Sequence, residues 1–140
     1  MSAIVRMATT DDLAALEPIL PAFLRPPNKH ARFLRALVNG DVSVAEDART
    51  VADFMWLTEF FGHTFVNVLA IEAEHRRHGY AGMLLEFAER DALTDRVFTS
   101  TNRSNVPMHT LLAHYGWTRC GEVDHIDPGD PEIVYVEYPR

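Results

Sequence analysis

The sequence predicts an α/β fold in which one mixed β-sheet carries helices on both faces. Its 140 residues are 47% apolar and 24% charged, which is typical of one globular domain covering residues 1–140. Segments with the period of strands alternate with segments that have the helical period, as expected when helices connect the strands of a sheet. The segment Thr64–Ile71 has apolar residues at both parities, which predicts a central strand covered on both faces.

The N-terminal half is predicted to contain a short strand, two helical regions and three consecutive strands. Thr9 and Asp12 form a capping-box-like helix start. Pro18 and Pro21 are expected to bend or split the helix that follows. A turn at Glu46-Asp47 is expected to join the first pair of these strands. The expected elements are a strand at Ala3–Met7, a helix at Asn28–Asn39, and strands at Asp41–Ala45, Arg49–Leu57 and Thr64–Ile71.

The C-terminal half begins with the clearest helix, in which apolar residues recur at helical spacing from Gly79 onward. A later helix has Asn105 as its N-cap, Pro107 in its first turn and Gly116 as its stop. A turn rich in Asp, Pro and Gly separates the final strand pair. The expected elements are a strand at Arg96–Thr99, a helix at Val106–Tyr115, and strands at Thr118–Ile126 and Glu132–Tyr138.

The charge balance disfavours several classes of partner. Thirteen basic residues against twenty acidic ones give a net charge of -7, so binding to nucleic acid or to an anionic membrane is not expected. An acidic protein suits a cationic or amine-bearing partner. The single cysteine, Cys120, excludes an intrachain disulfide, fits a cytoplasmic location, and is expected to pack as a small hydrophobe. No apolar run is long enough to cross a membrane.

A basic, glycine-containing turn is predicted between the strand that ends at Ile71 and the helix that follows Gly79. Amide groups at a helix N-terminus have no intrahelical acceptor, and the helix dipole favours negative charge there. Gly79 allows close approach to the backbone, and Arg76 and Arg77 add positive charge. The pattern predicts a phosphate or pyrophosphate site, although the arginines also fit a solvated pair at the helix entry. The P-loop and G-x-G-x-x-G motifs are absent.

Two segments carry motifs that indicate a family. The first is Arg76-x-x-Gly79-x-Ala81, preceded by a strand end at Leu69-x-Ile71. The second is Asn105-x-x-Met108-x-x-Leu111-x-x-x-Tyr115-Gly116-Trp117. They resemble the [QR]-x-x-G-x-[GA] and N-x-x-A-x-x-L-Y-x-x-x-G-F motifs of the GNAT superfamily of acetyl-CoA-dependent N-acetyltransferases. The resemblance extends to the order of elements over the chain, and implies a sheet of about six to seven strands flanked by about four helices.

The resemblance implies that acetyl-CoA is the co-substrate. Backbone groups at the strand end would hold the pantetheine arm and polarise the thioester carbonyl. The amides at the helix entry would hold the pyrophosphate, with Arg76 shaping the turn, and Asn105 would contact the pantetheine or a nearby phosphate from the other side. The expected cofactor-binding residues are Leu69, Ala70, Ile71, Arg76, Arg77, His78, Gly79, Tyr80, Ala81, Gly82, Asn105 and Met108.

Candidates for proton transfer come from both the resemblance and the residues. The family commonly has a tyrosine, the acid that protonates the leaving thiolate, at the position of Leu112. Tyr115 lies almost one helical turn further on and is the candidate acid, although its apolar stripe favours core packing. An amine must lose a proton before it attacks, and the candidates for this step are Glu59, His63 and Asn67.

Each of these assignments has an alternative. Glu59 also fits a solvated carboxylate, His63 a loop histidine without a role, and the thiolate could leave with help from solvent alone. No metal site is expected, because His75 and His78 supply only two ligands and have two cations between them.

The leading hypothesis is therefore an N-acetyltransferase that moves an acetyl group from acetyl-CoA to a primary amine by direct attack in a ternary complex. The acceptor would be a small-molecule or peptide amine, bound mainly by the segment Pro18–His30 and the hairpin around Asp127–Glu132. The alternatives are a non-catalytic acyl-CoA-binding sensor or interaction module, and a transferase for another acyl-CoA. Many members of this family form dimers, so the resemblance is also compatible with a homodimer.

Overall fold

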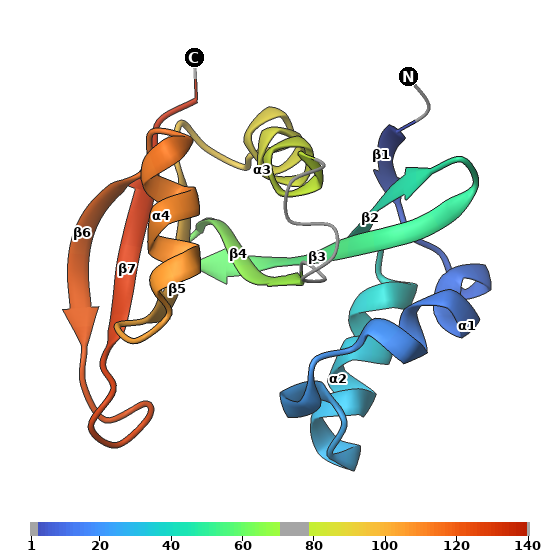
Figure 1. The fold of residues 1–140 in the computed structure, drawn as a ribbon, viewed down its shortest axis with the longest axis horizontal. Coiled ribbons are helices and arrows are strands. Elements are labelled where there is room, and N and C mark those ends of the chain that lie inside the picture. Colours follow the sequence, from blue (N-terminus) through green and yellow to red (C-terminus); the bar gives the residue numbers. More distant parts are fainter. Residues whose placement is uncertain (1–2, 71–78, 140) are drawn as a thin grey trace. The chain divides into compact units, whose positions relative to one another are not determined.

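The computed structural model describes residues 3–70 and 79–139, and its elements follow the predicted order (Figure 1). From the N-terminus these are β1 (Ala3–Met7), η1 (Thr10–Asp12), α1 (Leu13–Leu16), η2 (Glu17–Ile19), η3 (Ala22–Leu24), α2 (Pro27–Val38), β2 (Val42–Asp47), β3 (Thr50–Phe60) and β4 (His63–Ala70). They continue with α3 (Tyr80–Arg90), β5 (Val97–Asn102), α4 (Val106–His114), β6 (Thr118–Val123) and β7 (Glu132–Glu137).

The strands form one seven-stranded sheet in the order β1-β2-β3-β4-β5-β7-β6. β4 and β5 are parallel, whereas β1 with β2, β2 with β3, and β7 with both β5 and β6 are antiparallel. This pattern confirms the predicted mixed α/β fold. The chain divides into two compact units, Met1–Leu57 with Val68–Phe87, and Thr58–Asn67 with Ala88–Arg140, which are described separately below. A single domain over residues 1–140 stays a prediction.

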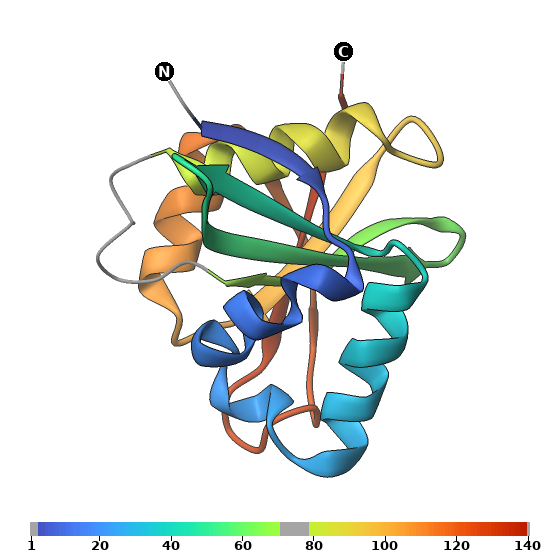
Figure 2. The same cartoon turned by 90° about the vertical axis from the view of Figure 1, so that its right-hand side faces the viewer.

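In the first unit, α1 and α2 lie on one side of β1 to β3, and α3 lies on the other (Figures 1 and 2). The side of α1 and α2 is closed by an apolar core in which the Phe33 ring contacts Phe54 edge-on at 5.5 Å and Trp56 at 6.0 Å. Phe33, Phe54 and Leu16 have no exposed surface. Such a core stabilises the sheet by removing apolar area from water.

The start of η1, the 3-10 turn that leads into α1, confirms the expected capping box. The Asp11 N–H donates to the Thr9 hydroxyl, and the Asp12 carboxylate accepts from the Thr9 N–H at 2.8 Å. Asp12 also accepts two hydrogen bonds from the Arg6 guanidinium, at 2.9 and 2.8 Å. These bonds are the main reason that the pKa of Asp12 lies below its usual value. As expected from the prolines, the helical segment is broken into short pieces around Pro18 and Pro21.

The turn between β2 and β3 lies at Ala48 and Arg49, so the predicted turn at Glu46-Asp47 is wrong. β2 continues through these acidic residues, with Glu46 paired to Val51 and Asp47 to Thr50. Their side chains are bonded elsewhere, Glu46 to Arg6 and Asp47 to Tyr80, which is why two carboxylates here do not mark a turn.

Replacing Ala48 with asparagine and Arg49 with glycine is expected to stabilise the protein. Both residues are exposed and have positive φ, 51° and 68°, the geometry of a type I′ turn, which Asn-Gly adopts with little strain. We expect the free energy of unfolding to rise by about 1 kcal/mol, which urea denaturation would measure. An unchanged or lower denaturation midpoint would show that this turn is not strained.

In the second unit, α4 packs on the face of β5 and β7 that carries Thr101 and Tyr135 (Figure 1). Leu112 of α4 is 1% exposed, and Val97 and Ile133 have no exposed surface. A separate aromatic group is centred on Phe60, whose ring centroid lies 5.4 Å from that of Phe65 and 5.3 Å from that of Phe98. Phe61 extends this group at the β3–β4 turn and is 88% exposed.

Cys120 lies on the exposed edge strand β6, so its expected role as a packed small hydrophobe is wrong. The register of β6 against β7 shifts between Arg119 and Gly121, which places Cys120 in a β-bulge. Bulges of this kind obstruct further strand pairing at a sheet edge.

None of the helices in residues 3–70 and 79–139 combines the length and apolar character needed to cross a bilayer.

Candidate functional site

The predicted anion site lies between β4 and α3 in the first unit. Leu69 and Ala70 are the last residues of β4 and are partly exposed. The predicted residues Ile71, Arg76, Arg77 and His78 lie outside the described residues. On the other side of this segment, the Gly79 carbonyl accepts from the Met83 N–H at 3.1 Å, so Gly79 starts the helix.

Gly79 is suited to a close approach of a ligand to the backbone. Its φ is +79°, and a Cβ placed on it would have no non-adjacent atom of residues 3–70 or 79–139 within 4 Å. Glycine is therefore favoured by conformation, and none of the described residues fills the space where a side chain would stand. Because the first-turn amides, such as those of Ala81 and Gly82, have no acceptor within the helix, this end of α3 can receive a negatively charged group.

Tyr80 connects this helix end to the β2–β3 hairpin. Tyr80 is 5% exposed, and its hydroxyl donates to Asp47 Oδ2 at 2.5 Å. This bond to a carboxylate, together with desolvation and the charges of Asp47 and the fully buried Asp53, raises the pKa of Tyr80. The phenol therefore stays protonated and keeps its donor role at neutral pH.

The second predicted part of the site, Asn105 with Met108, lies in the second unit. Asn105 is the N-cap of α4, as expected, with its Oδ1 accepting from the Met108 N–H at 3.3 Å. Its Nδ2 donates to the Thr101 hydroxyl at 3.0 Å. Asn105 is exposed, and no hydrogen bond among the described residues uses the other hydrogen of its amide, so it can donate to a ligand. The side chain is thus fixed in place by the fold.

The residues that precede Asn105 are held by α4 itself. His109 Nε2 lies 3.0 Å from the Asn102 carbonyl and 3.1 Å from the Arg103 carbonyl. Carbonyls only accept, so Nε2 carries the hydrogen, and in the neutral ring Nδ1 is left as the acceptor of the Tyr135 hydroxyl at 2.6 Å. His109 therefore connects the end of β5 to β7 through α4.

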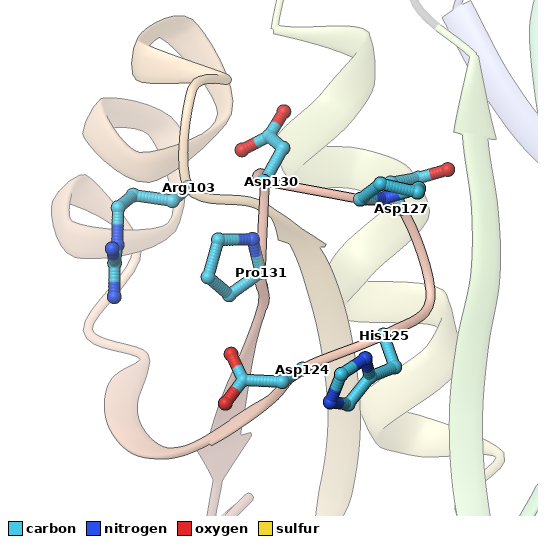
Figure 3. Close-up of a pocket in the computed structure, with 8 residues that line it drawn as sticks. Arg103, Asp124, His125, Asp127, Asp130 and Pro131 are labelled. Carbon is cyan, nitrogen blue, oxygen red and sulfur yellow. The ribbon is translucent and has the colours of Figure 1, made fainter.

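A cavity of about 390 Å³ lies in the second unit, in the loop between β6 and β7 (Figure 3). Three of its lining residues are carboxylates, Asp124, Asp127 and Asp130. Opposite charge is supplied by Arg103, from the β5–α4 junction. His125 has a φ of 72°, a conformation uncommon for residues other than glycine. The cavity is lined by Arg103, Asp124, His125, Asp127, Pro128, Gly129, Asp130 and Pro131.

The family model described as the Acetyltransferase (GNAT) family matches residues 12–117. The chain belongs to this family. The membership makes it an acyltransferase, in agreement with the motifs. No curated protein gives a significant match to the sequence.

Solved structures support the fold of this GNAT protein. It is similar to a GNAT-family acetyltransferase from Bacillus cereus, with a TM-score of 0.90 and 26% identity over 100% of this chain and 99% of that one. It also has the fold of Ard1 from Thermoplasma volcanium, with a TM-score of 0.80 and 13% identity over 99% and 98% of the chains. The ribosomal-protein-S18-alanine N-acetyltransferase of Escherichia coli has a TM-score of 0.75 and 17% identity over 98% and 94%.

The structure of this GNAT protein places Tyr115 at the end of α4. Tyr115 is the C-cap residue, is 39% exposed, and has its ring edge-on to His114 at 4.9 Å. The expectation that Tyr115 packs in the core is therefore wrong. Leu112, at the position where the resemblance places an acid, is buried instead. Tyr115 remains a candidate acid with access to solvent.

The three candidates for proton removal from the amine occupy different places. Glu59, on β3, and Asn67, on β4, are exposed. His63 is the first residue of β4, where its Nδ1 lies 2.6 Å from the Thr94 hydroxyl and its ring 5.5 Å from that of Phe98. His63 and the predicted cofactor-holding residues Leu69 and Ala70 are thus at opposite ends of one strand.

Sequence reasoning missed four residues that support these sites, Asp47, Ser104, His109 and Tyr135, and it included Asp130 in the expected acceptor hairpin without its bonds to Ser104. Each acts through a partner distant in the sequence, so local motifs carry no signal for the pair. Within the described ranges, no group of three or more His, Cys, Asp or Glu side chains is arranged to hold a metal ion.

Proposed function

We propose that this acyltransferase moves an acetyl group from acetyl-CoA to a primary amine. The observation that carries the proposal is the start of α3, where Gly79 has a φ of +79° at a helix N-terminus and no described residue fills the space beside its Cα. Such an end binds phosphate through amide groups and the helix dipole. Together with the family, this geometry favours a co-substrate that carries a pyrophosphate.

Each unit contains candidate residues for binding acetyl-CoA. The pyrophosphate would be held by the described residues Gly79, Tyr80, Ala81 and Gly82, together with the predicted residues Arg76, Arg77 and His78. Backbone groups of Leu69, Ala70 and Ile71 would hold the pantetheine arm, and Asn105 with Met108 would contact it from α4. Acetyl-CoA supplies an activated thioester.

The reaction proposed is a direct transfer in a ternary complex. The amine nitrogen forms a bond to the thioester carbonyl carbon, the carbon–sulfur bond breaks, and the sulfur takes the electron pair. The proton lost by the amine would pass to Glu59, directly or through water, or to His63, whereas the neutral amide of Asn67 would act by hydrogen-bonding a water that carries the proton away. The proton gained by the thiolate would come from Tyr115 or from solvent. Each residue would need to lie within hydrogen-bond reach of its proton, directly or through one water.

The acceptor amine would bind beside the β6–β7 loop. The cavity there has space of about 390 Å³, enough for a small molecule or the end of a peptide. Its carboxylates would attract a protonated amine, in keeping with the net charge of -7.

A second candidate function is a non-catalytic acyl-CoA-binding module. Leu112 favours it, because a buried leucine at 1% exposure stands where the family commonly has its acid. Thiol release from acetyl-CoA across a set of primary amines separates the two functions. Release that rises with an amine supports transfer, and binding of acetyl-CoA without stimulated release supports the module. Competition with propionyl- and succinyl-CoA would establish the acyl group.

Replacing Gly79 with alanine is expected to weaken acetyl-CoA binding about fivefold, because a Cβ at positive φ displaces the backbone that approaches the phosphates. Isothermal titration calorimetry would measure the dissociation constant.

Gly62→Ala is a matched control for this change. Gly62 has a φ of +82° and, like Gly79, no atom within 4 Å of an added Cβ, but it lies in the β3–β4 turn. Both variants should lose similar stability, and only Gly79→Ala should lose affinity. Equal affinities would remove Gly79 from the site, and a wild-type protein that binds no acetyl-CoA at millimolar concentration would overturn the proposed function.

A further inference from the structure

The loop between β6 and β7 is bonded directly to the junction of β5 and α4, both in the second unit. The Arg103 N–H donates to the Pro131 carbonyl at 2.8 Å. The Asn102 amide donates to Asp127 Oδ2 at 2.8 Å and to the Asp130 carbonyl at 3.2 Å. The loop that lines the cavity and the chain segment that leads to Asn105 therefore form one bonded structure.

Asp130 bonds this loop to Ser104 through both of its carboxylate oxygens. Its Oδ1 accepts from the Ser104 N–H at 3.0 Å, and its Oδ2 accepts from the Ser104 hydroxyl at 2.5 Å. Hydrogen bonds to a carboxylate are stronger than those between neutral groups. These bonds to Ser104 also hold the pKa of Asp130 below its usual range, so the carboxylate is charged at neutral pH.

Ser104 is the residue immediately before Asn105, so its position sets that of the helix cap. The Asn105 N–H donates to the Asn102 carbonyl at 2.9 Å, and the Val106 N–H donates to the Ser104 carbonyl at 2.9 Å. The carbonyls of Asn102 and Arg103 also accept from His109. With one side of the junction held by α4 and the other by Asp130, the orientation of Asn105 depends on both.

We propose that Asp130 is a positioning residue that couples the cavity loop to the acyl-donor site through Ser104 and Asn105. The inference rests on the proposed function, in which Asn105 contacts acetyl-CoA and the cavity receives the amine. A change in the loop on amine binding would move Ser104 and with it the Asn105 amide. Because such coupling is reciprocal, each substrate would change the affinity for the other by the same factor.

Replacing Asp130 with alanine should weaken acetyl-CoA binding about fivefold, measured by titration calorimetry on the full chain. Asp130→Asn should bind nearly as the wild type, because its oxygen can accept from the Ser104 N–H and its amide can donate to the Ser104 hydroxyl. Asp91→Ala is the matched control for lost negative charge, since Asp91 is an exposed residue of the same unit and makes no side-chain hydrogen bond within the described ranges.

A double-mutant cycle with Asn105→Ser distinguishes positioning from a general loss of stability. Serine keeps a helix-capping oxygen but lacks the amide proposed to contact the donor. In the Asn105→Ser background, Asp130→Ala should have little further effect on the dissociation constant, whereas a general structural effect would be additive. If Asp130→Ala does not fold, Asn102→Ala removes the neighbouring bonds and takes its place in the cycle.

The outcomes separate this inference from the function it rests on. If the wild type binds acetyl-CoA and the Asp130→Ala and Asp91→Ala variants bind it equally well, the role of Asp130 is overturned and the proposed function stands. Additive effects in the double-mutant cycle lead to the same conclusion. Absence of acetyl-CoA binding by the wild type overturns both. The coupling is supported if Asp130→Ala weakens acetyl-CoA binding, Asp91→Ala does not, and Asp130→Ala has little further effect in the Asn105→Ser background.

Discussion

Replacing Asp12 with alanine is expected to lower the free energy of unfolding by about 2 to 3 kcal/mol. Asp12 is 8% exposed and accepts from the Thr9 N–H and twice from Arg6. Alanine removes the Asp12 half of the capping box and leaves the Arg6 guanidinium with Glu46 as its carboxylate partner among the described residues. The loss is a large share of the stability of a domain of this size, and urea denaturation would measure it.

Asp11→Ala is the matched control, because Asp11 is exposed and its side chain makes no hydrogen bond in the described part of the chain. A loss near zero is expected for this variant. If Asp11→Ala and Asp12→Ala destabilised the protein equally, the effect would come from charge near the helix start and not from the Arg6–Asp12–Thr9 bonds.

The contribution of Asp12 should also depend on pH. Its pKa is lowered in the folded protein, mainly by the hydrogen bonds from Arg6. A lowered pKa contributes stability that is fully present above the unfolded-state value of about 4 and is lost as the pH falls through the folded-state value. The stability difference between the wild type and Asp12→Ala should therefore be constant from neutral pH down to about pH 5 and shrink below it.

Local rules account for the parts of the fold that the sequence predicted correctly. The Thr9–Asp12 capping box, the Asn105 cap and the breaks at Pro18 and Pro21 each depend on residues within a few positions, and the structure has all of them. The boundary of β2 failed because Glu46 and Asp47 resemble turn residues unless Arg6 and Tyr80 are known to bond them. Those partners are distant in the sequence.

The same division applies to the candidate site. The Gly79 turn is a local pattern, so the sequence located it before the fold was known. Asp130 reaches Ser104 across 26 positions and His109 reaches Tyr135 across 26, and neither pairing has a sequence signature. The exposed position of Tyr115 was missed for a related reason, since its apolar stripe ends where the helix does. Residues that support a site pair across the fold and leave no local sequence pattern, whereas residues that contact a ligand often belong to a short motif.

Replacing Tyr80 with phenylalanine is expected to weaken acetyl-CoA binding about tenfold by removing one charge-assisted hydrogen bond. The Tyr80 hydroxyl holds the first residue of α3 to Asp47, the last residue of β2. Phenylalanine keeps the ring packing but releases this contact, so the helix end that would bind the pyrophosphate is less well fixed. It also leaves the Asp47 carboxylate with one donor fewer near an anion. Titration calorimetry would measure the change.

The fragment acetyl-pantetheine makes this prediction specific. It has the thioester but no pyrophosphate, so Tyr80→Phe should weaken acetyl-CoA and leave acetyl-pantetheine unchanged. Tyr138→Phe is the control, because Tyr138 is 53% exposed and lies after β7. An equal loss for both ligands would mean that Tyr80 supports the site as a whole. Wild-type affinity in Tyr80→Phe would mean that the helix end is held without Asp47, and that the geometry of the anion site depends on backbone conformation at Gly79 alone.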